Sequence, residues 1–331
     1  MTGRIRVVVI GGGTGSEHEV SVASAAAIAG ALDRTRYDVI ELTLRRDGIW
    51  AQTGAAGLAD DLADAVRILG RADVVIPALH GPHGEDGTVA ALLDLVGVPY
   101  VGSGVAAGAI AMDKALTKLV AAESGVATAP GFVVRDAGDP RLGSAPLPAV
   151  VKPVRAGSSH GVAVVHARDG IAAAVRDALA LDDAVLVESF VHGREIDIAV
   201  VEHPDGTLEC SPALEIRVPD GGIFDTAGKY DAEPDFRVPA PLGATESAEV
   251  QAAAVALFRA LGCRGLARVD FFLTAGGLVL NEVNTFPGFT ARSQVPRMFA
   301  AAGVPYPELL DRLIATALVR ADGRRIRSRV A

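Results

Sequence analysis

The stretch Leu278–Pro296, "LVLNEVNTFPGFTARSQVP", decides how this chain is interpreted. Its first half, "LVLNEVN", is typical of a β-strand, in which Glu282 and Asn284 are two positions apart and share a face. The pattern ends at Pro287-Gly288, where proline removes a backbone donor and glycine permits a close backbone approach. An acid and an amide on one strand face indicate a polar site at this end of the strand.

The strand expected just before it, "GLARVDFFL", shows the same alternation, with Arg268 and Asp270 on one face. Carboxylate and amide oxygens are hard ligands of the kind that suit Mg²⁺ bridging phosphates. An arginine beside Asp270, Glu282 and Asn284 indicates that an anion binds there as well. The plainer interpretation is an ordinary polar sheet face closed by a salt bridge.

A glycine-rich loop follows a third strand in "AVVKPVRAGSSHGV", residues 149–162. Backbone N–H groups of such a loop can surround phosphate oxygens, and Lys152 would add a point charge. The loop is not a P-loop, because its lysine precedes the glycines. A tight surface hairpin is the alternative for this stretch taken alone.

Lysine is rare in this chain. Of 31 basic residues only four are lysines, which marks their positions as candidates for needing a compact ammonium rather than a guanidinium. They are Lys114, Lys118, Lys152 and Lys229. Lys229 and Tyr230 occur in "IFDTAGKYD", which is typical of a mobile loop.

Two further motifs follow strands of the N-terminal region. "GGGTGSEHEVS" fails the dinucleotide fingerprint at Ser16, and it presents Glu17 at the carboxyl end of a strand, where open α/β sheets bind ligands. "ALHGPHGEDGT" places His80, Glu85 and Asp86 at the same edge. A hydrogen-bonded structural histidine is the alternative for His80.

Composition limits the class of protein. The 331 residues are 50% hydrophobic and 21% charged, which is typical of a globular protein of two or three domains. A net charge of -9 argues against a nucleic acid as the main partner, and no apolar run approaches the roughly 20 residues of a membrane span. Cys210 and Cys263 lack metal or redox spacing, so we expect a cytoplasmic protein with reduced cysteines.

Alternating strand and helix patterns over residues 1–112 predict a parallel α/β unit with helices on both faces. Residues 113–197 predict a small α+β unit, and residues 198–322 a mostly antiparallel one. The stretch "VPYVGSG" is expected to be a strand, and "VAAGAIAMDKALTKLVAAESG" a single helix. The basic tail, residues 323–331, is expected to fray.

Taken together, these motifs make the chain resemble the D-alanine–D-alanine ligases of the ATP-grasp superfamily, from about Val7 to Leu318. The resemblance implies an ATP-grasp fold with an N-terminal parallel α/β subdomain, a central α+β lid and a C-terminal antiparallel subdomain. It rests on seven stretches in family order: "GGTGSEHEVS", "LHGPHGEDGT", "YVGSGVAAGAIAMDK", "VVKPVRAGSSHGV", "KY" at 229–230, "RGLARVDFFL" and "NEVNTFPGFT".

The resemblance also implies a role for each matching residue. The first carboxylate attacks ATP to give an acyl phosphate, the second amine attacks that intermediate, and two Mg²⁺ ions, which Mn²⁺ can replace, offset charge. Metal ligands would be Asp270, Glu282 and Asn284. ATP contacts would be Lys114, Lys152, Ser159, Glu188, Ser189, Phe190, Val191, Glu195 and Lys229, with Lys118 outside the ligand positions. Catalytic and substrate contacts would be Glu17, His80, Ser158, Tyr230, Arg268, Gly288, Ser293 and Gln294.

The sequence departs from the family pattern around the second substrate. Gln294 follows Ser293 where leucine or another apolar residue is usual, and Phe224 and Thr226 stand where tyrosines are common. The leading interpretation is ligation of two D-alanines for peptidoglycan synthesis, by a homodimer as in the family. The alternatives are a ligase taking another second D-amino acid such as D-serine, a nucleotide-binding oxidoreductase, and a catalytically silent nucleotide sensor.

Overall fold

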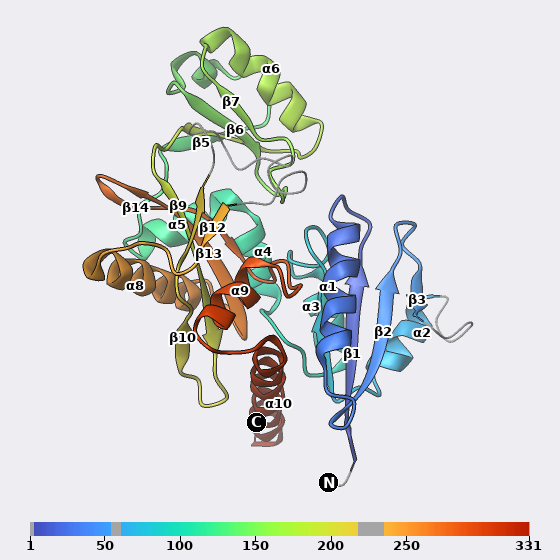
Figure 1. Cartoon of the computed structure of the whole chain (residues 1–331). Helices are drawn as coiled ribbons and strands as arrows, with labels where there is room; N and C mark the ends of the chain where they lie inside the picture. Colours follow the sequence, from blue (N-terminus) through green and yellow to red (C-terminus); the bar gives the residue numbers. More distant parts are fainter. Residues whose placement is uncertain (1–2, 54–60, 218–234, 331) are drawn as a thin grey trace.

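The computed structural model describes residues 3–53, 61–217 and 235–330, with side chains up to Ala321. The four loop residues singled out above therefore lie outside the described part: Phe224, Thr226, Lys229 and Tyr230. The described chain builds three sheets, and Figure 1 shows the N-terminal sheet beside the C-terminal one, with the central unit above.

The N-terminal sheet has the strand order β3-β2-β1-β4. β1 is parallel to both β2 and β4, as expected, and only the short β3 runs antiparallel. The apolar residues of "VVVI" in β1 are fully buried, because helices cover the sheet. The elements are β1 (Ile5–Gly12), α1 (His18–Ala31), β2 (Tyr37–Leu44), β3 (Trp50–Gln52), α2 (Leu62–Leu69), β4 (Val74–Pro77) and α3 (Thr88–Val96).

Two helices lead from this unit to the central one: α4 (Val105–Met112) and α5 (Lys114–Glu123). The central sheet is antiparallel, with the order β5-β8-β6-β7, and α6 packs on it through Ile171 and Val175. Its elements are β5 (Gly131–Val134), a short 3-10 helix η1 (Pro140–Ser144), β6 (Ala149–Pro153), β7 (Ala163–Val165), α6 (Arg168–Leu179) and β8 (Val185–Ser189).

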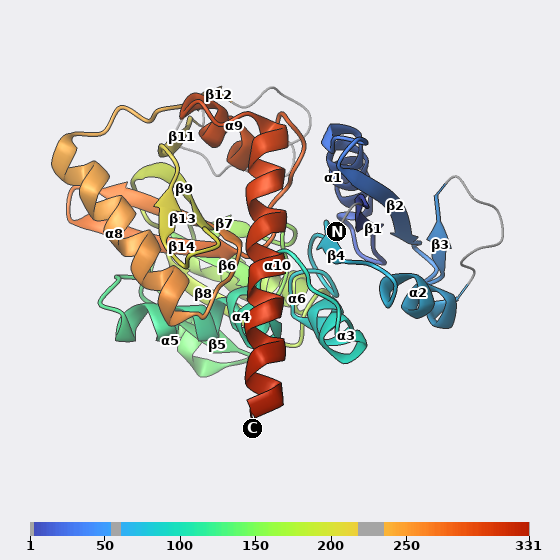
Figure 2. The same ribbon diagram turned by 90° about the horizontal axis from the view of Figure 1, so that it is seen from below.

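The C-terminal sheet is also antiparallel, with the order β12-β11-β9-β13-β14 and β10 paired to β9. Figure 2 shows α8 on one side of it and α10 between it and the N-terminal unit. The elements are β9 (Arg194–Glu202), β10 (Leu208–Cys210), β11 (Leu214–Arg217), β12 (Asp235–Arg237), α8 (Ala244–Ala260), β13 (Leu266–Thr274), β14 (Gly277–Asn284), α9 (Gln294–Ala301) and α10 (Tyr306–Val330).

A shared core joins the two ends of the chain. Buried residues of β1 and α1 lie in one apolar cluster with Leu309 and Leu313 of α10 and with Phe289. At the rim of this cluster the Tyr37 hydroxyl donates to Asp311 Oδ1 at 2.7 Å. The N-terminal sheet is thus held against the C-terminal unit by packing as well as by the chain itself.

Several elements differ from the sequence-based expectation. The single helix expected after residue 104 is two helices, because Asp113 is extended and its carboxylate caps α5 by accepting from the Leu116 N–H at 3.0 Å. The expected strand at residues 98–104 is only an isolated bridge between Val75 and Tyr100. β3, α2 and α9 were not expected. α10 continues as a helix through residues of the basic segment that was expected to fray.

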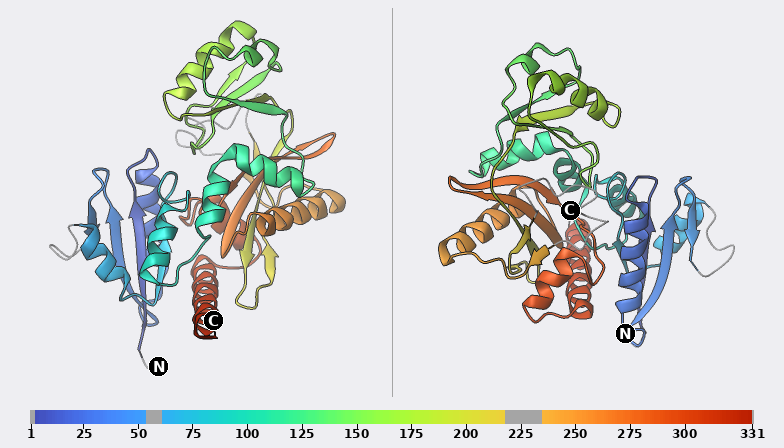
Figure 3. Two further views of the ribbon diagram at one scale, coloured as in Figure 1. Left: turned by 180° about the vertical axis from the view of Figure 1, so that it is seen from behind. Right: turned by 45° about the horizontal axis from the view of Figure 1, so that its top comes forward.

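Both α4 and α5 pack against the C-terminal sheet (Figure 3). Ala107 and Ala121 of these helices share a buried cluster with Val269 and Val283 of β13 and β14. This packing brings Lys114, the first residue of α5, beside Glu282 of β14.

Candidate active site

A cavity of about 950 Å³ lies where the three units meet. It collects every predicted site residue within the described part of the chain, from all three units. These are Glu17, His80, Lys114, Lys152, Ser158, Ser159, Glu188, Ser189, Phe190, Val191, Glu195, Arg268, Asp270, Glu282, Asn284, Gly288, Ser293 and Gln294. Predictions made from separate motifs therefore converge on one space, whereas Lys229 and Tyr230 fall outside the described residues.

The acidic and amide side chains predicted to share a polar site lie on two paired strands, β13 and β14. Asp270 of β13 is directly opposite Glu282 of β14, and Arg268 is directly opposite Asn284. The Arg268 guanidinium makes a two-bond contact to Asp270, with 2.7 Å from both Nε and Nη2. The Asn284 amide also donates to Asp270 Oδ2, at 3.0 Å. The polar side chains thus form one connected group on the cavity wall.

Electrostatics keep Arg268 charged. Burial alone would lower its pKa, but Asp270 outweighs that effect, and the pKa of Arg268 rises above its ordinary value. Asp197 adds to this, with its Oδ2 at 3.8 Å from Arg268 Nε. A permanent cation therefore stands next to three acidic or amide side chains, where it can balance an anion or an oxyanion.

The donor chemistry of Asp270, Glu282 and Asn284 fits a hard divalent cation, since two carboxylates and an amide oxygen come from paired strands facing the cavity. Within the described residues, no cluster of three or more His, Cys, Asp or Glu side chains is close enough to hold a metal.

Asp197 belongs to this group and was missed from the sequence. It pairs directly with Asp270 across β9 and β13 and is 1% exposed, and its Oδ1 has no hydrogen-bond partner within the described part of the chain. Burial, followed by the Asp270 charge, raises the pKa of Asp197 well above its ordinary value. The signal was available, because Glu195 and Asp197 alternate on one strand as Arg268 and Asp270 do.

A second charged group lies on the wall formed by the central sheet. Val150 is the residue opposite Glu188, so Lys152 is diagonal to Glu188 on the same face. Lys152 Nζ is 2.5 Å from Glu188 Oε1, and Lys118 pairs with Glu188 Oε2 from α5. Burial would raise the pKa of Glu188, but the two lysines outweigh it and lower the pKa.

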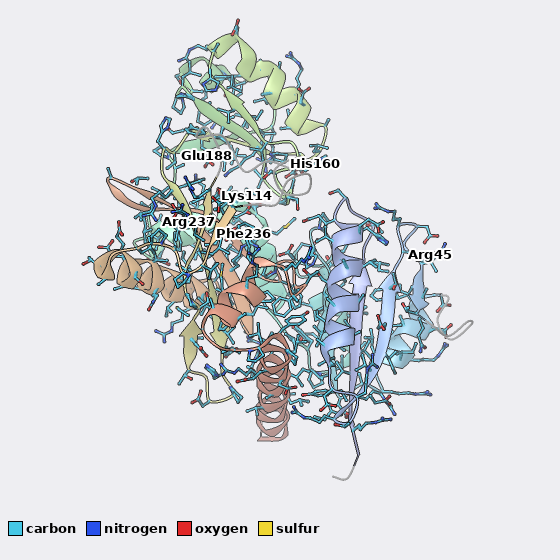
Figure 4. All side chains as sticks on the ribbon, viewed as in Figure 1. Arg45, Lys114, His160, Glu188, Phe236 and Arg237 are labelled. Atoms are coloured by element: carbon cyan, nitrogen blue, oxygen red, sulfur yellow. The ribbon has the colours of Figure 1, made fainter. Side chains whose placement is uncertain are left out.

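Lys114 links the two groups. It is the first residue of α5, and its Nζ donates to the Ala156 carbonyl at 2.6 Å and lies 3.8 Å from Glu282 Oε2. Figure 4 labels Lys114 and Glu188, which lie between the central and C-terminal sheets. Two lysines on one wall and a set of acidic residues on the other match the needs of a metal-bound polyphosphate.

The glycine-rich loop folds over the N-terminus of α1. Ser158 and Ser159 have φ of 50° and 58°, in the left-handed region, and the Ser158 hydroxyl donates to Glu17 Oε1. Gly157 allows this approach, because a Cβ there would be 2.7 Å from Glu17 Oε2. The glycine-rich loop and Glu17 are therefore in direct contact.

His80 and Glu85 lie under the cavity in the N-terminal unit. His80 is 5% exposed, and its ring nitrogens contact Ser24 Oγ and the Phe286 carbonyl, each at 2.9 Å. Burial lowers the pKa of His80 to about 4, so it is neutral and structural as well as cavity-lining. Burial, with the nearby Glu17 charge, raises the pKa of Glu85 to about 8.

The turn after β14 leads into α9, whose N-terminus faces the cavity. Ser293, the residue before α9, stabilises the turn by accepting from the Thr290 N–H at 3.0 Å. Gln294 is the first residue of α9, lines the cavity and carries a buried Oε1 with no hydrogen-bond partner in the part of the chain that the structure describes. An unpaired buried amide oxygen next to a cavity is a costly arrangement unless a ligand donates to it.

Two family models match most of the chain. The model described as D-ala D-ala ligase N-terminus matches residues 6–103, and the model described as D-ala D-ala ligase C-terminus matches residues 141–315. The chain belongs to the D-alanine–D-alanine ligase family. It is therefore a ligase, and its fold is the ATP-grasp fold that the resemblance implied.

Similar proteins agree along nearly the full length. The chain is 42% identical to a D-alanine–D-alanine ligase of Corynebacterium aurimucosum in an alignment 352 positions long, which covers 96% of this chain and 98% of the relative. It is also 42% identical to one from Mycobacterium tuberculosis in an alignment 365 positions long, which covers 97% of each chain.

Solved structures show the same fold. The VanG D-Ala:D-Ser ligase from Enterococcus faecalis aligns with a TM-score of 0.85 at 31% identity, covering 95% of this chain and 100% of that one. A D-alanine–D-alanine ligase from Bacillus anthracis complexed with ATP aligns with a TM-score of 0.81 at 29% identity, covering 97% and 99%. No helix among the described residues is long and apolar enough to cross a membrane.

Proposed function

We propose that this protein joins two D-alanines with ATP, forming D-alanyl-D-alanine for peptidoglycan synthesis through an acyl phosphate. One observation carries the proposal: a single cavity is lined by two lysines, an Asp–Glu–Asn set and a glycine-rich loop, together with Glu17 and the first residue of α9. The lysines suit a polyphosphate, and Glu17 suits an ammonium group. The cavity thus has places for a nucleotide and for an amino acid together.

In the first step, a carboxylate oxygen of the first D-alanine attacks the γ-phosphorus of ATP. The bond from that phosphorus to the β,γ-bridging oxygen breaks, and ADP leaves. Lys114 and Lys152 balance the charge on the phosphates, and Glu17 holds the ammonium of the amino acid. Asp270, Glu282 and Asn284 would hold Mg²⁺, which when bound offsets the charge of the phosphates.

In the second step, the amine of the second D-alanine attacks the acyl carbon. The new C–N bond forms, the C–O bond to phosphate breaks, phosphate leaves and the nitrogen loses a proton. The Arg268 guanidinium and the backbone N–H of Gly288 stabilise the oxyanion of the tetrahedral intermediate. The N-terminus of α9, beside Ser293, receives the carboxylate of the second substrate.

The loop that carries Lys229 and Tyr230 has a proposed role although it lies outside the described residues. Lys229 adds a cation for ATP, and Tyr230 joins Ser158 and Glu17 in a hydrogen-bonded group that closes the loop over the site. A closed loop keeps water away from the acyl phosphate. By resemblance to the family we propose that the enzyme acts as a homodimer and that Mn²⁺ can replace Mg²⁺.

A second candidate substrate is supported by Gln294. Its buried, unpaired Oε1 lines the cavity, and a hydroxyl on the second substrate could donate to it. D-serine as second substrate is therefore the alternative, and one structural neighbour carries that description in its title, the VanG D-Ala:D-Ser ligase.

A screen of ADP release tests the proposal. Single D-amino acids and D-amino acid pairs are supplied with Mg·ATP, and products are identified by mass spectrometry. The proposal requires ADP and D-alanyl-D-alanine in equal amounts from D-alanine alone. Preferred formation of D-alanyl-D-serine from the mixed pair supports the alternative, and the absence of any ADP-forming D-amino acid removes both.

A further inference from the structure

Lys118 forms an ion pair with Glu188, a residue of the cavity wall, but does not line the cavity itself. Lys114 and Lys118 are four residues apart and lie on the same face of α5. Lys114 lines the cavity, whereas Lys118 does not. The Lys118 ammonium instead reaches the rear oxygen of Glu188, Oε2, and the Ala129 carbonyl at 2.5 Å.

Glu188 is shared between this lysine and Lys152. Its front oxygen, Oε1, pairs with Lys152 Nζ at 2.5 Å, and both Lys152 and Glu188 line the cavity. The three side chains are 8% to 18% exposed, so water screens their interactions only weakly. One carboxylate thus stands between two ammonium groups in a poorly solvated wall.

The net charge of Lys118, Glu188 and Lys152 depends on Lys118. With Lys118 present, the three groups sum to one net positive charge. Without it, Glu188 and Lys152 would neutralise each other, and Lys152 would be held in a closed ion pair. We infer that Lys118 is a positioning residue that balances Glu188 from behind and so frees the charge of Lys152 for the phosphates of ATP. This inference rests on the proposed function, because it assigns ATP to this cavity.

The inference is tested by ligand binding, which needs no turnover. Isothermal titration compares Mg·AMP-PNP, Mg·ADP and adenosine as ligands of the parent, of Lys118→Met and of Lys118→Gln. The glutamine variant keeps a donor for the Ala129 carbonyl and covers the case in which the methionine variant does not fold. We expect the Kd of Mg·AMP-PNP to rise about tenfold, that of Mg·ADP to rise less, and that of adenosine to change by less than about twofold.

Two controls separate electrostatics from structure. Lys118→Arg keeps the charge and should restore most of the affinity. Arg155→Met removes a cation from Asp182 in the same central unit, outside the cavity wall, and should leave all three Kd values unchanged.

A double-mutant cycle gives the decisive comparison. In a Glu188→Gln background there is no carboxylate for Lys118 to balance, so Lys118→Met should have little further effect on Mg·AMP-PNP. Equal weakening of all three ligands by Lys118→Met, or the same loss in the Glu188→Gln background, would overturn the inference. A parent that does not bind Mg·AMP-PNP would overturn the proposed function itself, whereas an unchanged Kd in Lys118→Met overturns this inference alone.

Discussion

Glu282 is the cleanest single residue for testing the metal assignment. Removing Asp270 would leave the buried Arg268 without its main partner, which confuses loss of metal with loss of stability. Glu282 has a side chain 24% exposed, and Lys114 is 3.8 Å away. We therefore expect Glu282→Gln to abolish ADP formation while the melting temperature changes little.

The measurement is ADP release at saturating ATP and D-alanine, beside a thermal melt. Glu308→Gln is the matched control, because it removes an equally charged carboxylate from an exposed ion pair on α10. Normal turnover of Glu282→Gln at ordinary Mg²⁺ would remove the metal assignment.

Gln294 offers a residue-scale test of the second substrate. If its unpaired Oε1 accepts from a substrate hydroxyl, Gln294→Leu should shift the ratio of kcat/KM for D-serine to that for D-alanine toward D-alanine by roughly 10- to 100-fold. The variant should also be slightly more stable, since a buried unsatisfied acceptor is gone. Gln251→Leu on α8 is the exposed control. A ratio that stays constant would sink the D-serine alternative.

Residue types and two-residue spacing predicted one polar group of the cavity wall in advance, and the family resemblance supplied most of the other expected residues. They marked Arg268, Asp270, Glu282 and Asn284, and the structure places all four in one hydrogen-bonded or cross-strand group. Asp197 was overlooked although it has the same spacing from Glu195. Its importance depends on the strand that lies next to β9, and neighbouring strands are not visible in a local pattern.

At the scale of elements, the contact between the glycine-rich loop and α1 has a testable consequence. The Ser158 hydroxyl donates to Glu17, and Tyr230 is proposed to complete the group. Ser158→Ala and Tyr230→Phe should each weaken the proposed closure of the loop that carries Tyr230. The free energy of closure should change by about 1 kcal/mol, which raises the open population roughly fivefold. Water would then reach the acyl phosphate, and the amount of ADP formed per dipeptide should rise.

The check is the ratio of ADP to dipeptide measured in one reaction by chromatography. Ser144→Ala in the exposed η1 turn serves as the control, because its hydroxyl contacts only the local Arg141 carbonyl among the described residues. Equal coupling in parent and both variants would refute the closed group.

Elements were predicted well where apolar periodicity was strong and poorly where a tertiary contact decides. β1, β6, β13 and β14 follow their patterns closely. The break between α4 and α5 depends on one cap at Asp113, which lies inside an otherwise continuous helical pattern. Lys118 was expected to stand outside the ligand positions, and its pairing with Glu188 depends on how α5 packs beside the central sheet.

At the scale of the whole molecule, His80 joins the N-terminal unit to the turn after β14. The pKa of His80 is about 4 in the folded protein and ordinarily 6.5. Between pH 4 and 6.5 His80 is therefore protonated in the unfolded chain but not in the folded one. The contribution of His80 to the free energy of unfolding is therefore complete above pH 6.5 and is lost as the pH falls toward 4. The pKa of Glu85 is raised from 4.5 to about 8, so its effect on stability has the opposite pH dependence. Its contribution to the free energy of unfolding is lost as the pH rises toward 8.

Comparing the parent with His80→Gln isolates the histidine. The stability difference between the two proteins should shrink by about 2 kcal/mol from about pH 7 to about pH 5, while the slope from Glu85 cancels in the comparison. Chemical denaturation at each pH provides the measurement. A difference that does not depend on pH would show that His80 does not remain neutral in the folded protein.

The central claim is that three units bring ATP and an amino acid together so that an acyl phosphate forms. Transfer of ¹⁸O tests it most directly. D-alanine labelled with ¹⁸O in its carboxylate is incubated with enzyme and Mg·ATP, and the phosphate released is read by ³¹P NMR. An acyl phosphate carries one labelled oxygen to inorganic phosphate, with ADP and D-alanyl-D-alanine as the other products. Unlabelled phosphate, or label found in AMP, would contradict the account.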